Sequence, residues 1–468
     1  MKIEQIYTGC LAQGAYYIES EGEVAIIDPL REVQSYIQKA KKDNATVKYI
    51  FETHFHADFV SGHLELSKKT NAPIIYGPNA NPTFECIVAT DGQVFEIGKL
   101  KIKVLHTPGH TMESSCYLLF DENNNEYCIF TGDTLFIGDV GRPDLAQKST
   151  ITQDDLAGLL FDSLRNKIMP LPNDLLVYPA HGAGSACGKN MSKETFDTLG
   201  NQKLFNYALR ANMTKAEFVH EVTDGLTPPP YYFPQNVMLN KTGARDIAAV
   251  KNQIVALSAN AFEAAANETG AVVIDTRLAQ TFKNGFVPNS INIGIKGDFA
   301  PWVGTLITDI GQQILFVADA QDTDEVITRL SRVGYDNIIG YLDGGFETWQ
   351  QADKEIDSIV SIGADEFSKR FLETELTVRD VRKPTEYTAE HVNEAMNIPL
   401  AVLSDNMVEF SKTDTNYIHC AGGYRSMMAC SILKARGFDN VIDVAGGFAA
   451  IAQTNIPKSD FVCQSKMR

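Results

Sequence analysis

The sequence predicts an α/β protein built of three domains. Its 468 residues correspond to about three domains of roughly 150 residues each. Short β-rich runs such as GEVAIIDP and VKYIFET alternate with helical patterns as far as about residue 223, with breaks at Gly, Pro, Asn and Asp. The proline-rich stretch DGLTPPPYYFPQN (224–236) suits neither a helix interior nor a central strand, and it predicts a linker.

Beyond this linker the chain repeats itself at an offset of about 103 residues. AVVIDTRLAQTFKNGFVPNSINI (271–293) is similar to LTVRDVRKPTEYTAEHVNEAMNI (376–398), and GYDNIIGYLDGGFETW (334–349) is similar to GFDNVIDVAGGFAAI (437–451). Repeats of this length predict two tandem α/β domains, each with a parallel sheet wrapped by helices. We therefore expect domains over 1–236, 237–357 and 358–468.

Composition excludes several classes of protein. The net charge is −18 with no basic run, which argues against nucleic-acid binding. A chain that is 44% hydrophobic and 21% charged is not broadly disordered. No apolar stretch approaches the roughly 18 residues that a membrane helix requires. The first twenty residues lack the apolar core of a signal peptide, so the sequence predicts a cytoplasmic protein that binds no membrane.

The cysteines do not show paired spacing. In a cytosolic chain of this size, scattered cysteines do not predict a disulfide framework, and most are expected to be small buried side chains. There are eight of them: Cys10, Cys86, Cys116, Cys128, Cys187, Cys420, Cys430 and Cys463.

Histidines and aspartates gather where predicted strands end. A loop at a strand end suits His54 and His56, because they stand too close for the i, i+4 presentation of a helical zinc motif. Imidazoles and carboxylates at strand termini are the ligand types that a divalent metal needs, so the sequence predicts a metal site. The candidates are His54, His56 and Asp58 in THFHADF, His110 in TPGH, Asp133 in TGD, and His181 in YPAHG.

These motifs resemble the metallo-β-lactamase superfamily, in its glyoxalase II and persulfide dioxygenase branch, over about residues 1–223. The resemblance implies an αββα sandwich. The superfamily pattern H-x-H-x-D-H departs here at its last position, where Phe59 replaces the histidine that binds a second metal in two-zinc members. Since phenylalanine coordinates nothing, a mononuclear site is favoured.

The persulfide dioxygenases imply a particular ligand set. Carried over by position, the ligands are His54, His110 and Asp133, which is the two-histidine, one-carboxylate triad of non-haem Fe(II) enzymes. One Fe(II) per chain is expected, with the persulfide sulfur and O2 in the open positions. His56, Asp58 and His181 would orient ligands and water around the metal.

We also expect that Cys187, in the Gly-rich AHGAGSACGKN (180–190), could relay sulfur, although a buried thiol in a tight turn is the simpler interpretation. Arg142 is a candidate anion contact.

A second constellation surrounds Cys420. The cysteine ends a predicted strand, and a short glycine-containing loop then runs into a helix. Backbone N–H groups of such a loop, the helix N-terminus and Arg425 favour the thiolate, which is the nucleophile for sulfane sulfur. The loop consists of Ala421, Gly422, Gly423, Tyr424, Arg425 and Ser426.

This constellation resembles the rhodanese (sulfurtransferase) family over about residues 362–462, including Asp380-Val381-Arg382 and Gly446-Gly447-Phe448. Four residues separate Cys420 from Arg425, which is the sulfurtransferase length rather than the C-x5-R of related phosphatases. The middle domain has ILFVADAQDTDEV (314–326) at this position, where Ala318 or Asp319 replaces the cysteine. We expect a degenerate rhodanese-like domain that packs or orients its neighbours.

The two resemblances together predict coupled steps of sulfide detoxification. A low-molecular-weight persulfide of glutathione, coenzyme A or a similar thiol would be oxidised by O2 to sulfite, and Cys420 persulfide would pass sulfur to sulfite to give thiosulfate. The reverse use of thiosulfate remains open. The alternatives are a zinc thioester hydrolase of glyoxalase II type with an independent rhodanese, and a non-catalytic sulfur carrier or sensor. A homo-oligomer is expected from the resemblance.

Overall fold

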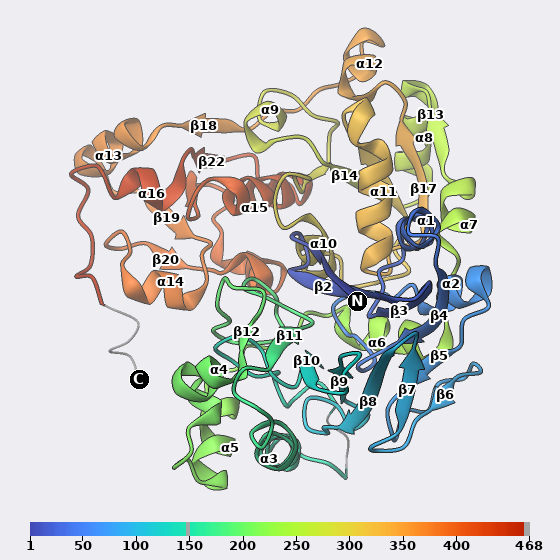
Figure 1. Ribbon diagram of the computed structural model, residues 1–468. Helices are drawn as coiled ribbons and strands as arrows, with labels where there is room; N and C mark the ends of the chain where they lie inside the picture. Colours follow the sequence, from blue (N-terminus) through green and yellow to red (C-terminus); the bar gives the residue numbers. More distant parts are fainter. Residues whose placement is uncertain (147–149, 463–468) are drawn as a thin grey trace. The chain divides into compact units, whose positions relative to one another are not determined.

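The computed structural model describes residues 1–146 and 150–462 (Figure 1). Contacts divide the chain into two compact units. The first comprises Met1–Ala249 with Thr308–Ile310 and Thr328–Asp336, and the second comprises Val250–Ile307, Gly311–Ile327 and Asn337–Arg468. The α/β prediction is confirmed in both units. Among the described residues, no helix has the length and apolar character needed to cross a membrane.

The first unit contains two six-stranded sheets. One has the order β1-β2-β3-β4-β5-β6 and the other the order β12-β11-β10-β9-β8-β7. Their strands are β1 (Lys2–Thr8), β2 (Gln13–Ser20), β3 (Glu23–Ile27), β4 (Thr46–Phe51), β5 (Ile74–Tyr76), β6 (Ile87–Val88), β7 (Val94–Ile97), β8 (Leu100–His106), β9 (Ser115–Phe120), β10 (Glu126–Gly132), β11 (Leu176–Pro179) and β12 (Asp197–Thr198).

Alternation along the strands builds a layered core. In β9, Tyr117 and Leu119 face the other sheet, while Leu118 joins the cluster beneath the helices, because successive side chains point to opposite faces. The Tyr117 ring lies 4.8 Å from that of Phe51 of the opposite sheet. Both sheets are therefore buried between layers, as the predicted αββα sandwich requires.

Helices cover the outer faces of the two sheets. Tyr36 of α1 packs on β3 and β4, whereas Leu160 of α3 and Phe218 of α5 pack on β8, β9 and β10. The helices of this part are α1 (Gln34–Lys42), α2 (His63–Thr70), α3 (Gln153–Ser163), α4 (Leu199–Phe205), α5 (Lys215–Thr223) and α6 (Phe233–Thr242), with a π-helical turn at Leu164–Ile168 and a 3-10 turn at Tyr207–Leu209; α7 (Ile247–Gln253) lies at the boundary of the units.

The predicted linker (224–236) extends too far, because its last residues belong to a helix. Helix α6 begins at Phe233, inside the stretch expected to connect two domains, and Pro234 lies in its first turn. Proline is tolerated there because the first N–H groups of a helix have no intrahelical partner in any case. The helix contributes a buried side chain to the candidate site described below.

The second unit contains two parallel sheets of five strands, in the orders β13-β17-β16-β14-β15 and β18-β22-β21-β19-β20, so the predicted repeat is confirmed. The first sheet has β13 (Val255–Leu257), β14 (Val272–Asp275), β15 (Ile291–Asn292), β16 (Ile314–Val317) and β17 (Ile338–Leu342), with helices α8 (Ala259–Glu268), α9 (Ala279–Phe282), α10 (Phe299–Leu306), α11 (Thr323–Arg332) and α12 (Gly345–Gln351) and a 3-10 turn at Ala320–Asp322. The end of α11 belongs to the first unit.

The second sheet repeats this arrangement. Its elements are β18 (Val360–Ile362), β19 (Thr377–Asp380), β20 (Met396–Asn397), β21 (Asn416–His419), β22 (Val441–Val444), α13 (Ala364–Glu373), α14 (Pro384–Ala389), α15 (Tyr424–Ala435) and α16 (Gly447–Ile451), with a 3-10 segment at Leu400–Glu409. The seven cysteines among the described residues are free, as predicted, and Cys463 lies outside the described residues.

Candidate functional sites: a histidine–aspartate centre and a cysteine loop

The candidate metal ligands lie where strands end, as the sequence predicts. His54 follows β4, His110 follows β8, Asp133 follows β10, and His181 follows β11. Glycine allows the loops to meet. Gly132 has a φ of +52°, and a Cβ there would lie 2.7 Å from the Cβ of Thr53.

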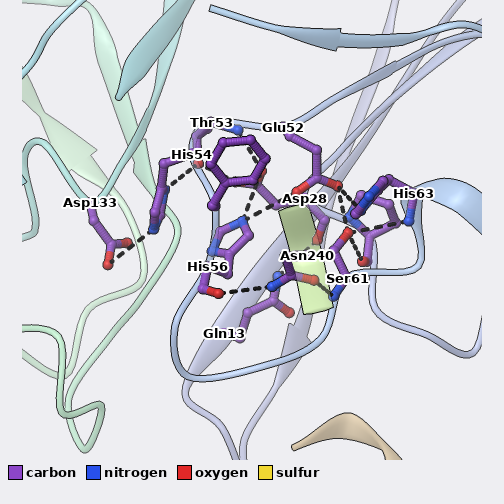
Figure 2. A network of polar contacts seen from close by, with 12 residues as sticks. Gln13, Asp28, Glu52, Thr53, His54, His56, Ser61, His63, Asp133 and Asn240 are labelled. Atoms are coloured by element: carbon purple, nitrogen blue, oxygen red, sulfur yellow. Dashed lines mark hydrogen bonds and ion pairs between the residues drawn. The ribbon is translucent and has the colours of Figure 1, made fainter. Parts of the chain in front are cut away.

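His54, His110 and Asp133 form one buried group. Their ligand atoms lie within 4.8 Å of one another. The Nε2 atoms of His54 and His110 lie 3.8 and 3.4 Å from Oδ2 of Asp133. Figure 2 shows Asp133 facing the His54 ring. The three residues predicted from the resemblance are thus brought together.

Hydrogen bonds fix which ring nitrogen faces the group. Nδ1 of His110 lies 2.8 Å from the backbone carbonyl oxygen of Arg142, which can only accept, so Nδ1 carries the proton. Nδ1 of His54 lies 3.0 Å from the hydroxyl of Thr53, which itself donates to Asp28. Both rings therefore leave Nε2 free to coordinate. Burial and the neighbouring imidazoles hold the pKa of His54 well below its usual value, so this ring is neutral, as a ligand must be.

The carboxylate of Asp133 fits a cation. Both of its oxygens are buried, and neither has a hydrogen-bond partner among the described residues. A buried carboxylate without donors is costly unless a positive charge compensates it. A divalent metal held by His54, His110 and Asp133 would supply that charge, so the donor set fits the predicted metal.

His56 is turned towards two acids. Its Nε2 atom lies 3.1 Å from Oδ1 of Asp28 and 3.6 Å from Oε2 of Glu52 (Figure 2). Burial by itself lowers the pKa of His56, but the charges of Asp28 and Glu52 outweigh it and raise the pKa to about 9. Phe59 packs on the ring at 4.3 Å between centroids. The sequence did not identify Asp28 or Glu52.

Asn240 of α6 holds the loop that carries these residues. Its side-chain amide donates to the carbonyl oxygens of His56 and Phe59, both at 2.8 Å, and its oxygen accepts from the N–H of Ser61 at 2.7 Å. Asn240 is buried and far away in the sequence, so no local signal pointed to it.

His181 lies near the second carboxylate oxygen of Asp133, and Asp58 lies beside His181. Nε2 of His181 is 3.4 Å from Oδ2 of Asp58 and 3.6 Å from Oδ1 of Asp133. The Cys187 sulfur lies within 4.8 Å of the ligand atoms of Asp133 and His181. Burial raises the pKa of the Cys187 thiol well above its usual value. Asp58 and His181 therefore adjoin the candidate centre together with Cys187, and a ring nitrogen of His56, the third predicted neighbour, lies within 4.8 Å of the ligand atoms of Asp58 and His181.

Arg142 has a structural role instead of the expected anion-binding one. Its guanidinium pairs with Asp144 at 2.6 Å and donates to the carbonyl oxygens of Ala186 and Thr227. The side chain is buried, so these partners use its donors inside the fold. The role expected from the sequence is not supported.

Cys420 lies between β21 and α15, in the predicted strand–loop–helix setting. The residue is buried, and its sulfur accepts the backbone N–H of Gly423 at 3.1 Å. The thiol lies 3.6 Å from the hydroxyl of Ser426, which in turn donates to Asp443 at 2.7 Å. The helix N-terminus and the Gly423 N–H thus act on the same sulfur atom.

Arg425 forms an ion pair with an acidic residue that the sequence did not single out. Its guanidinium forms two parallel hydrogen bonds with Glu386, at 2.7 and 2.8 Å. Burial tends to raise the pKa of Glu386, but the hydrogen bonds from Arg425 lower it overall. The positive charge beside Cys420 is therefore partly compensated by Glu386.

Strand register identifies the residue that replaces the cysteine in the first repeat. Asp275 pairs with Val317 in one sheet as Asp380 pairs with His419 in the other, so Ala318 stands where Cys420 does. This decides between the two candidates left open by the sequence. Alanine offers no nucleophile at this position.

Comparison with known proteins agrees with this architecture. Residues 8–181 match the model of the metallo-beta-lactamase superfamily, and residues 258–352 and 363–454 match that of the rhodanese-like domain. A solved structure described as a metallo-beta-lactamase from Staphylococcus aureus is 30% identical, with a TM-score of 0.64, covering 73% of this chain and 98% of that chain.

Two further relatives cover less of the chain. A probable hydroxyacylglutathione hydrolase of Schizosaccharomyces pombe is 33% identical over 166 residues, which are 35% of this chain and 60% of that protein. The structure of ETHE1 from Myxococcus xanthus is 28% identical and has a TM-score of 0.45, covering 52% of this chain and 98% of that one.

Proposed function

We propose that this chain, which belongs to the metallo-β-lactamase superfamily and carries two rhodanese-like domains, oxidises a low-molecular-weight persulfide with O2 and transfers sulfur through Cys420. The observation that carries the oxidation step is the donor set: two imidazole nitrogens and one carboxylate without hydrogen-bond partners among the described residues, with Phe59 in place of a further ligand. Such a set suits one Fe(II) with open coordination positions.

The first reaction converts R–S–S⁻, O2 and H2O into R–SH, SO3²⁻ and H⁺. When bound, Fe(II) supplies the redox chemistry by which O2 is reduced while the outer sulfur is oxidised. The chain's own part is to hold the donors in place. The backbone carbonyl of Arg142 and the hydroxyl of Thr53 orient the two imidazoles, and Asp28 fixes the ring of His56 through its Nε2 atom.

The second reaction belongs to Cys420. A second persulfide loads the cysteine, as Cys–S⁻ and R–S–S⁻ give Cys–S–S⁻ and R–S⁻. Sulfite then attacks the outer sulfur of the Cys420 persulfide, so that Cys–S–S⁻ and SO3²⁻ give Cys–S⁻ and S2O3²⁻. The Gly423 N–H faces the cysteine sulfur and stabilises the negative charge left there. The reverse direction, from thiosulfate to persulfide, uses the same contacts. The first rhodanese-like domain has Ala318 and takes no part in this chemistry.

Oxygen uptake tests the proposal. The Fe(II)-loaded protein is given glutathione persulfide or coenzyme A persulfide, and sulfite and thiosulfate are measured in the same samples. The wild type should consume O2, and Cys420→Ser should consume it at the same rate while thiosulfate falls and sulfite rises. Cys430→Ser, which alters a buried cysteine on α15, should behave as the wild type. Absence of uptake with iron bound would refute the oxidation step.

A second candidate is a zinc thioester hydrolase with an independent rhodanese. It is favoured by the similarity to hydroxyacylglutathione hydrolases and by Asp58 and His181, whose unpartnered atoms lie beside Asp133. Turnover of a hydroxyacylglutathione by the zinc-loaded protein, without O2 uptake by the iron-loaded protein, would establish this alternative. Retention of all activity in Asp133→Asn would instead favour a sulfur carrier in which the first domain is a scaffold.

A further inference from the structure

We infer that the inactive rhodanese-like domain positions the catalytic loop of the active one, through a seat for Tyr424 formed by Gly294 and Gly297. This inference rests on the proposed sulfurtransferase activity of Cys420. It assigns Tyr424, Gly294 and Gly297 as positioning residues, which act on the cysteine through the loop that carries it. Gly294, Gly297 and Tyr424 all belong to the second compact unit.

Tyr424 crosses from the catalytic loop to the other domain. It is the first residue of α15 and follows Gly423, whose N–H donates to the Cys420 sulfur at 3.1 Å. Its hydroxyl donates to the carbonyl oxygen of Gly294 at 2.7 Å. An anchor at Tyr424 therefore fixes the residue next to the donor that faces the nucleophile.

The ring of Tyr424 lies directly on glycine backbone. A Cβ on Gly297 would lie 2.6 Å from Cζ of Tyr424 and 2.9 Å from both Cε atoms. A Cβ on Gly294 would lie 3.3 Å from Cε2. Real Cβ atoms do not approach as closely as 2.6 Å, so any larger residue at 297 must displace the ring or the segment that carries it.

The internal repeat shows that these glycines are specific to the inactive domain. Strand register aligns Asn292 with Asn397, because each faces the aspartate of its own D-x-R motif. Counting on from there, Gly294 corresponds to Pro399 and Gly297 to Val402. At both positions that receive Tyr424, the inactive domain thus has glycine and its sister does not.

A second contact fixes α15 on the same segment. The N–H of Asn292 donates to the hydroxyl of Ser431 at 2.9 Å, and both residues are buried. Ser431 lies seven residues after Tyr424, two turns further along the same helix face. The segment 291–297 therefore holds α15 at two points, its first residue and its eighth. The domain that lacks the cysteine thus carries the seat for the loop of the other domain.

Kinetics of the purified full chain test the inference. Gly297→Ala is compared with Gly363→Ala, which makes the same change where nothing lies within 4 Å of the new Cβ. With thiosulfate as donor and cyanide as acceptor, Gly297→Ala should lower kcat about tenfold with less than a twofold change in the KM for thiosulfate. Tyr424→Phe, which keeps the ring and loses one hydrogen bond, should lower kcat about threefold. Gly363→Ala should equal the wild type.

Two measurements separate positioning from general damage. In a Tyr424→Ala background, Gly297→Ala should have no further effect on kcat, since the ring that it displaces is gone. The alkylation rate of Cys420 by iodoacetamide, followed by mass spectrometry of its peptide, should change at least threefold in Gly297→Ala and not in Gly363→Ala.

An unchanged kcat and alkylation rate in Gly297→Ala would overturn the inference, as would full additivity with Tyr424→Ala. The alkylation readout does not depend on turnover. Cys420→Ser is the negative control, which is expected to transfer no sulfur. If the wild type also transfers none, the proposed function fails, but the alkylation rates still test the contact between the domains.

Discussion

The two candidate sites are assembled in opposite ways. The metal centre combines His54, His110 and Asp133, each supplied by the end of a different strand. The cysteine loop is a single run of residues from Cys420 to Ser426, and a local strand–loop–helix turn brings its groups together. The first site therefore depends on the packing of the whole sandwich, whereas the second depends mainly on one turn and on the partner that fixes it.

The sharpest test of this separation removes one ligand. Asp133→Asn keeps the size of the side chain but removes its charge, so the affinity for Fe(II) should fall at least about a hundredfold, since even residues that only orient ligands change affinity by 10–100-fold. Oxygen uptake should be lost in parallel. Metal content after dialysis measures the effect. Sulfur transfer by Cys420 from thiosulfate to cyanide should be unchanged, and its loss would contradict the independence of the two sites.

The loop that carries His56 is held by Asn240 of a distant helix, so removal of this support should destabilise the first unit strongly. Asn240→Ala leaves the carbonyls of His56 and Phe59 and the N–H of Ser61 buried without their partner, so it should cost about 3 kcal/mol of unfolding free energy. Denaturant unfolding of the metal-free protein measures this. Asn123→Ala, at an exposed position in the same unit, should change stability by less than about 0.5 kcal/mol. Equal effects of the two variants would contradict the role of α6.

Replacing Phe59 tests whether a further ligand can be added to the candidate metal centre. Phe59→His places an imidazole beside His56, on the side of Asp58 and His181, and restores the pattern H-x-H-x-D-H. The zinc content of the zinc-loaded protein should rise from one towards two per chain, and Phe59→Leu should leave it at one. Elemental analysis after gel filtration distinguishes them. A single zinc in Phe59→His would mean that the held position of His56 limits the site to one metal.

The contrast also explains which residues could be predicted from the sequence. Strand-end motifs are local, so the histidines and aspartates of the candidate metal centre and the cysteine loop follow from short patterns, and the repeat follows from self-similarity. The choice of His54, His110 and Asp133 as ligands and the αββα layering came from the family resemblance instead. Asp28, Asn240 and Glu386 act through contacts with residues 25, 184 and 39 positions away, which no local pattern encodes. Helix α6 was missed for a related reason, because the prolines before it and in its first turn suggested a linker, and its contacts are visible only in the packed fold.

The smallest expected effect concerns the ion pair beside the cysteine. Because the pKa of Glu386 is lowered in the folded state by Arg425, the pair stabilises the fold above the unfolded pKa of about 4.3, and this contribution is lost as the pH falls through the lower folded value. Glu386 is partly exposed, so solvent screening limits the contribution to below about 1 kcal/mol.

Unfolding free energies of wild type and Glu386→Gln should therefore differ at pH 7 and converge towards pH 3. Glu366→Gln, which removes an exposed i, i+4 pair with Arg370 in the same domain, is the matched control and should show the smaller difference. A constant gap between wild type and Glu386→Gln across this range would show that Glu386 acts by packing and that Arg425 keeps its full charge for the Cys420 loop.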